Sequence, residues 1–119
     1  MPLLGKDQIL TAEDLPYRDV EVPEWGGTVR VRTMSGGERD AFEASLYVRE
    51  GEEMIYKREH FRAKLLARCI VDDKGARLFS DKEIETLSGK SSKALNRLFD
   101  AAQEINAISR EEQETIKKK

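Results

Sequence analysis

The sequence predicts an α+β fold, in which an N-terminal β-hairpin packs on a mostly helical bundle of four to five helices. Three observations predict this class. Valines alternate with charged residues between positions 20 and 32, Ser-x-x-Glu capping boxes recur after them, and apolar residues recur at helical spacing. The chain has 119 residues, which fits one domain large enough to fold without a disulfide or a metal ion.

The first predicted element is the hairpin. Valines alternate with charged residues in residues 20–22 and again in residues 29–32, which is the period of strands with one buried face. Between them, the stretch PEWGG supplies a proline at a strand end and glycines that can take a positive φ. We expect three charged side chains on the solvent face of the hairpin: Glu21, Arg30 and Arg32.

A two-stranded hairpin is barely stable alone in water, so its valine face must pack on helices. The two helices that follow it in the chain are the expected partners. The first opens with a capping box of Ser35 and Glu38 and ends at Gly51. The second runs from about Met54 or Lys57 to residue 70 and carries an apolar stripe.

Further helices are predicted in the second half of the chain. A capping box of Ser80 and Glu83 opens a short helix that ends before Gly89. Ser91 or Ser92 caps the next helix, which keeps a regular apolar stripe: Leu95, Leu98, Phe99, Ala102 and Ile105. A last, mostly polar helix is expected to begin with Ser109 and Glu112.

These elements divide the chain into three parts. Residues 1–16 lack clear periodicity and are expected to form an extended or flexible N-terminal arm. Residues 17–108 form a single α+β domain, and residues 109–119 form a polar C-terminal tail that frays at its terminal lysines.

The charges of the chain are balanced, with 21 Lys and Arg against 23 Asp and Glu. Nucleic-acid binding needs a concentrated basic face, so the composition argues against a nucleic-acid partner. The one cysteine, Cys69, lies in the apolar run LLARCIV and is expected to be buried and unreactive. No apolar run is long enough for a signal peptide or a membrane span, so we expect a cytoplasmic protein without a membrane partner.

Four motifs resemble sites but lack the required pattern. The stretch GKSS at residues 89–92 lacks the earlier glycine of a P-loop, and the glycine pairs after Trp25 and Ser35 do not make a dinucleotide fingerprint. The segment from Asp72 lacks the glycine of a calcium loop. His60, the one histidine, is expected at a solvated helix position. We therefore predict no catalytic residue, no cofactor, no metal and no small-molecule substrate.

Trp25 is different, because a large apolar side chain in a hairpin connection is at least partly exposed. Two interpretations stay open. The ring folds back over the valine face, or it anchors a partner, as exposed tryptophans often do.

The stretch VEVPEWGGTVRVRTMSGGERDAFEASL resembles the N-terminal signature of the tail assembly chaperones of long, non-contractile-tailed bacteriophages and their prophages. In that family a VPEWGG-x-V-x-VR hairpin leads into a helix that opens with G-x-ERD. Downstream, the segments DDKGARLFS, LSGKS and LNRLFDAAQEIN are similar to the rest of the family pattern. The resemblance extends from about Leu10 to Ile108.

The resemblance implies a non-enzymatic chaperone in the cytoplasm of a bacterial host. Such a protein binds the tape measure protein, keeps it soluble and helps to recruit subunits of the major tail tube protein; self-association is a further expectation. The alternative is a generic small adaptor or regulatory protein of a prophage. Four residues are expected to contribute to partner contacts: Trp25, Arg30, Arg39 and Arg97.

Overall fold

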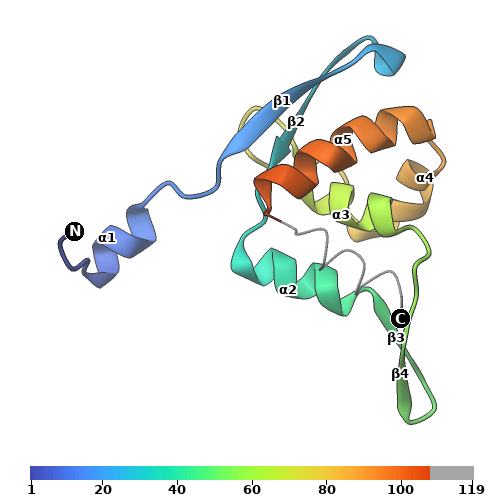
Figure 1. Cartoon of the computed structure of the whole chain (residues 1–119), viewed down its shortest axis with the longest axis horizontal. Helices are drawn as coiled ribbons and strands as arrows, with labels where there is room; N and C mark the ends of the chain where they lie inside the picture. The colour runs from blue at the N-terminus through green and yellow to red at the C-terminus, as the bar shows by residue number, and fades with distance from the viewer. Residues whose placement is uncertain (108–119) are drawn as a thin grey trace.

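The computed structural model describes residues 1–107, which form short helices and two small antiparallel sheets (Figure 1). In chain order the elements are α1 (Lys6–Thr11), β1 (Tyr17–Val22), the 3-10 turn η1 (Pro23–Trp25), β2 (Gly27–Arg32), α2 (Gly36–Ala44), β3 (Tyr47–Glu50), β4 (Glu53–Tyr56), α3 (Phe61–Cys69), β5 (Ile70–Val71), the 3-10 turn η2 (Asp81–Glu83), α4 (Ile84–Ser88) and α5 (Ser92–Ile105). The predicted α+β class is confirmed. The predicted helix at Ser109 and the tail of residues 109–119 lie outside the described residues.

β1 and β2 form the predicted hairpin. Val20 lies opposite Val29 and both pack against the core, whereas Glu21 is exposed on the other face. Arg30 and Arg32 lie on that polar face, as predicted, but both are partly buried because each is paired with a carboxylate of the same chain. The hairpin is not a two-stranded sheet, since β5 pairs antiparallel with β2 and gives the order β1–β2–β5.

The valine face packs mainly against α5, which lies across β1 and β2 in Figure 1. The prediction that the helix opening at Ser35 packs on this face is wrong: α2 packs against α3 instead. The reason is the width of the apolar stripes. α2 buries one side chain, Phe42, whereas α5 buries six and can therefore cover a strand pair. α3 does contact β2, as predicted for the second helix.

The core lies between α3 and its neighbours. Leu65 and Leu66 of α3 are fully buried. The ring of Phe61 makes edge-to-face contacts with Phe42 of α2 at 5.7 Å and with Phe99 of α5 at 5.6 Å between ring centroids. These aromatic contacts join α2, α3 and α5 into one core.

The two glycine pairs of the hairpin region shape the backbone. Gly26 has a φ of +70°, a conformation that glycine adopts without strain, and it turns the chain between η1 and β2. Gly36 and Gly37 form the first turn of α2, inside the predicted capping box. In that box the Ser35 hydroxyl accepts from the Glu38 amide at 3.2 Å, and the Glu38 carboxylate accepts from the Ser35 amide at 2.8 Å.

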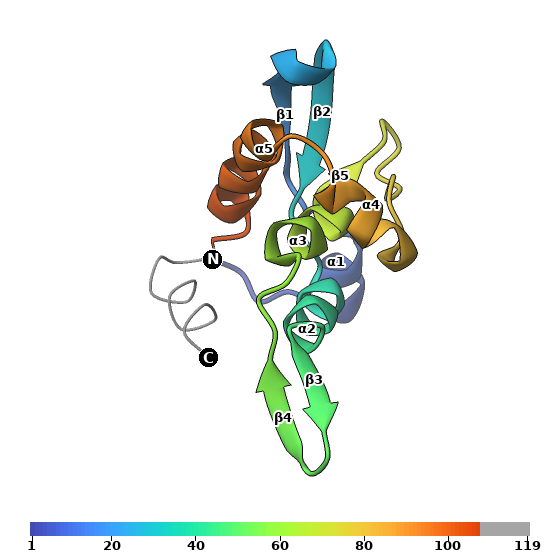
Figure 2. The same cartoon turned by 90° about the vertical axis from the view of Figure 1, so that its right-hand side faces the viewer.

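A second hairpin, β3–β4, was not predicted and projects from the body of the protein in Figure 2. The apolar residues after Ser35 keep a helical spacing, which predicts one helix from Ser35 to Gly51. The helix ends at Ala44, and Gly51, with a φ of +63°, instead turns the new hairpin. The tyrosines Tyr47 and Tyr56 stabilise the pair through an edge-to-face contact at 5.8 Å.

The second predicted helix is also shorter than expected. It begins at Phe61 rather than near residue 54 or 57, since β4 extends to Tyr56 and residues 57–60 connect it to the helix. It ends at Cys69, because Ile70 and Val71 pair with β2 as strand β5. The later elements follow the prediction, with Ser91 as the N-cap of α5.

The N-terminal arm, expected to be extended or flexible, contains a six-residue helix, α1, so its backbone is not extended over Lys6–Thr11. Its flexibility stays a prediction. None of its residues is buried, and the helix lies away from the rest of the protein (Figure 1). The arm exposes several large apolar side chains: Met1, Leu3, Leu4, Ile9 and Leu10.

Candidate partner-binding site

The candidate site is an apolar groove where the connection of the first hairpin approaches α4; we call it the Trp25 groove. Its volume is about 290 Å3, and its lining is almost wholly apolar. The lining residues are Trp25, Phe79, Thr86, Leu87 and Lys90. Trp25 is partly buried and packs against the core while it also forms one wall of the groove. It is therefore neither fully folded away nor fully exposed.

An ion pair fixes the turn that carries Trp25. The Arg97 Nε atom of α5 donates to both carboxylate oxygens of Glu24, at 3.0 and 3.1 Å. A hydrogen bond from its own backbone amide, together with Arg97, holds the pKa of Glu24 below its usual range. Glu24 precedes Trp25 in η1, so this pair holds the Trp25 wall against α5. Among the three predicted arginines, Arg97 is thus the one that the structure links to Trp25.

Arg30 lies on the polar face of the first hairpin, where it makes a two-pronged pair with Asp19 at 2.7 and 3.1 Å. This hydrogen bonding lowers the pKa of Asp19. The Arg30 guanidinium also lies 3.8 Å from the centre of the Tyr17 ring. Arg30 is not part of the Trp25 groove, and its contribution to partner contacts stays a prediction.

Arg39 belongs to α2 and binds groups of the same chain. Its Nε atom donates to Glu43 at 3.2 Å, and its Nη1 atom donates to the Asn106 carbonyl at 3.0 Å. The latter bond ties α2 to the C-terminal end of α5. Arg39 is likewise absent from the lining of the Trp25 groove, and its role in partner contacts stays a prediction.

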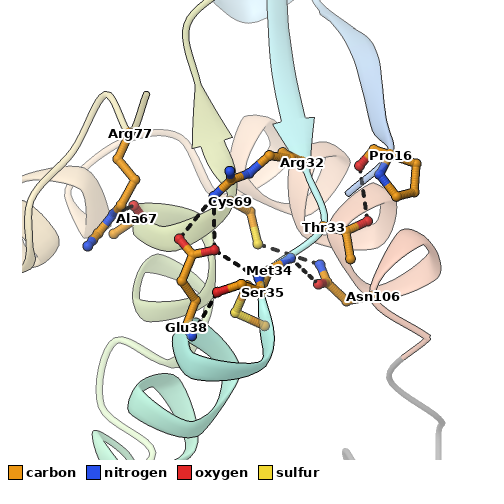
Figure 3. A network of polar contacts seen from close by, with 10 residues as sticks. All are labelled: Pro16, Arg32, Thr33, Met34, Ser35, Glu38, Ala67, Cys69, Arg77 and Asn106. Carbon is orange, nitrogen blue, oxygen red and sulfur yellow. Dashed lines mark hydrogen bonds and ion pairs between the residues drawn. The ribbon is translucent and has the colours of Figure 1, made fainter. Parts of the chain in front are cut away.

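A buried polar network joins the end of α5 to the start of α2 (Figure 3). The Asn106 side chain accepts a hydrogen bond from the Met34 amide at 2.7 Å and donates to the Ala102 carbonyl at 2.7 Å and to the Cys69 Sγ atom at 3.5 Å. Burial raises the pKa of the Cys69 thiol to about 12, which agrees with the expected unreactive cysteine. The network orients α2 and α5 around the core.

Replacing Asn106 by leucine is expected to lower the free energy of unfolding by about 2 kcal/mol, because the buried Met34 amide loses its acceptor. Urea denaturation followed by circular dichroism measures this change. The matched control is Asn96→Leu at an exposed position of α5, for which we expect a change within about 0.5 kcal/mol. Equal stabilities for the two variants would contradict the structural role of Asn106.

The motifs that resemble sites have structural roles in the described residues. Ser91 of the GKSS stretch caps α5 by accepting from the Ala94 amide. Asp72 accepts from two backbone amides of its own turn, so its carboxylate closes the turn instead of facing a cation. His60 is partly buried rather than solvated, and its Nδ1 atom lies 2.8 Å from the Ser88 hydroxyl. Over residues 1–107, no cluster of three or more His, Cys, Asp or Glu side chains could hold a metal ion, and no helix is long and apolar enough to cross a membrane.

Most of the groove cannot be predicted from the sequence. Phe79, Thr86 and Leu87 lie more than 50 residues from Trp25 in the chain, and no local pattern relates them to it. The available signal was the Arg-Leu-Phe segment before the Ser80 capping box, which places an aromatic ring at a helix entry.

Comparisons with known proteins give a family match and a similar solved structure. A family model described as phage tail assembly chaperone matches residues 6–119. Among solved structures, that of the bacteriophage HK97 tail assembly chaperone is similar, with a TM-score of 0.49 and 21% sequence identity over 80% of this chain and 90% of that chain. No curated protein sequence matches the chain.

Proposed function

Since the chain belongs to the phage tail assembly chaperone family, whose model spans residues 6–119, we propose that it binds the tape measure protein in the cytoplasm of the bacterial host. When the chain is bound to the tape measure protein, it keeps that protein soluble and helps to recruit subunits of the major tail tube protein. A tape measure protein is long and helical, with apolar faces that remain uncovered until tube subunits surround it. Its chaperone needs apolar docking surface and a charged exterior.

The observation that carries this proposal is the Trp25 groove. An apolar groove of about 290 Å3 that is open to solvent suits the apolar side chains of a helical segment. Tryptophan is among the residues that contribute most to binding energy at interfaces, above all when its ring is held in place, as Trp25 is by η1 and the neighbouring Glu24–Arg97 pair.

Two protruding elements add apolar surface around the body. The arm exposes Leu4 and Ile9, and the second hairpin exposes Val48 and Met54. Large exposed apolar side chains are typical of protein interaction sites. The outer edge of β1 is also unpaired within the described sheet, so strand addition is a further docking mode.

The proposed role is non-enzymatic. Cys69, the one cysteine, is buried with a raised pKa, and His60, the one histidine, is placed against the Ser88 hydroxyl. The Cys69 thiol is not arranged as a nucleophile, because it is buried and its Sγ atom lies against the Asn106 amide. Binding through side-chain contacts is the activity that these residues support.

Co-expression tests the proposal. The tape measure protein of the same phage is produced with this chain, and in parallel with an unrelated soluble protein at matched expression levels. We expect the soluble fraction of the tape measure protein to rise at least severalfold with this chain, and the two proteins to co-purify. Equal soluble fractions in both cultures would contradict the proposal and favour the small adaptor as the function.

A further inference from the structure

A second pocket lies next to the Trp25 groove, where α3 and α5 both begin; we call it the basic pocket. Its volume is about 260 Å3. Three exposed cations surround it, Arg58, Arg62 and Lys90, and no carboxylate is among its lining residues. Its apolar wall is formed by Phe61, Leu95 and Phe99.

The three cations differ from most arginines of the described residues. Within residues 1–107, none of Arg58, Arg62 and Lys90 forms an ion pair, whereas arginines elsewhere, such as Arg30 and Arg97, are held by carboxylates. The Arg62 guanidinium lies 5.7 Å from the centre of the Phe99 ring, which keeps its charge at the pocket.

Other charges near the pocket leave this positive potential in place. One carboxylate contacts a lining residue: the Glu59 oxygen lies 3.4 Å from the His60 Nε2 atom, but the Glu59 side chain is 79% exposed and its charge is screened by water. α5 begins at the pocket, with Ser92 in the lining, so the positive end of its helix dipole adds to the cations. The pocket thus attracts an anionic group.

The position of the pocket indicates where that group comes from. Lys90 lines both the basic pocket and the Trp25 groove, so the two form adjacent parts of one surface. A segment whose apolar side chains fill the groove continues past Lys90 into the pocket. The aromatic wall suits the methylene stem of a glutamate or a neighbouring apolar residue better than a small hydrated ion.

We propose that the basic pocket binds an acidic side chain of the polypeptide segment that occupies the Trp25 groove. This inference rests on the proposed function and specifies the partner: an acidic residue stands beside the apolar residues that dock. The same charge arrangement would reject a segment with lysine at that place, which gives the surface selectivity as well as affinity.

A synthetic probe tests the pocket directly. The probe is a blocked 16-residue amphipathic helix with leucines along one face and glutamates beside them; its control carries glutamine in place of each glutamate. The full chain, labelled with 15N, is titrated with each peptide and with inorganic phosphate. We expect the glutamate peptide to shift the backbone amides of residues 58–62 and 88–92 in a saturable way, and the glutamine peptide to bind about tenfold more weakly.

Variants of the chain check the origin of the effect. Arg62→Gln combined with Lys90→Gln is expected to weaken the glutamate peptide about tenfold, while Lys82→Gln, an exposed cation outside the pocket, leaves its affinity unchanged. Equal binding of the two peptides, shifts confined to other residues, or phosphate binding as tightly as the peptide would each overturn the proposal. The titration is independent of tape measure solubility, so failure here and failure of the proposed function are distinguishable.

Discussion

Replacing Leu98 by alanine is expected to lower the free energy of unfolding by about 3–4 kcal/mol. Leu98 is fully buried at the middle of α5, the helix that covers the valine face of the first hairpin and packs against α3. Truncation removes apolar contact with both layers and leaves a cavity between them. For a domain of this size the loss is a large share of the total stability.

Chemical denaturation followed by far-ultraviolet circular dichroism measures the effect. The matched control is Asp100→Ala, an exposed position on the same helix, for which we expect a change within about 0.5 kcal/mol. A loss below about 1 kcal/mol for the Leu98 variant would contradict a core in which α5 packs against both the first hairpin and α3.

Local sequence patterns were sufficient where local interactions decide the structure. The alternating valines gave the first hairpin its correct strands, and the capping boxes at Ser35 and Ser80 mark real helix starts. The apolar stripe that ends at Ile105 defines α5, because a long amphipathic helix has one face that can be buried.

The patterns failed where tertiary contacts decide. Residues 47–56 carry both a helical spacing and a strand composition, and the positive φ at Gly51 resolves the conflict in favour of a hairpin. The two residues of β5 are a strand only because β2 lies beside them. No local pattern could indicate that pairing.

The site shows the same division. The sequence singles out Trp25, because its type and its place in a turn are unusual, and the structure places it in the lining of the Trp25 groove. Its contact with a partner stays a prediction. The sequence could not show that Arg97 pairs with Glu24, or that Arg30 pairs with Asp19, since ion pairing depends on which side chains folding brings together. The GKSS stretch lacks the pattern of a nucleotide site, but Lys90 of this stretch lines both the Trp25 groove and the basic pocket.

A charge in the Trp25 groove is expected to reduce capture of the tape measure protein about tenfold, since an apolar partner segment would have to bury that charge. Thr86→Glu introduces one at the exposed rim, where the side chain has no role in the core. This position is preferable to Trp25 itself, because Trp25→Ala would also remove packing against the core. A glutamate at position 86 lies four residues before Lys90 in the chain. Thr86→Gln, which adds length without charge, is therefore measured as a second control.

The decisive measurement is the amount of tape measure protein retained by immobilised wild-type chain, Thr86→Glu and Asn96→Glu at equal loading. Asn96→Glu adds the same charge on an exposed face of α5 outside the groove lining. With unfolding midpoints unchanged, we expect Asn96→Glu to retain as much as the wild type and Thr86→Glu about one tenth as much. Equal retention by all three proteins would show that the tape measure protein does not dock in the Trp25 groove.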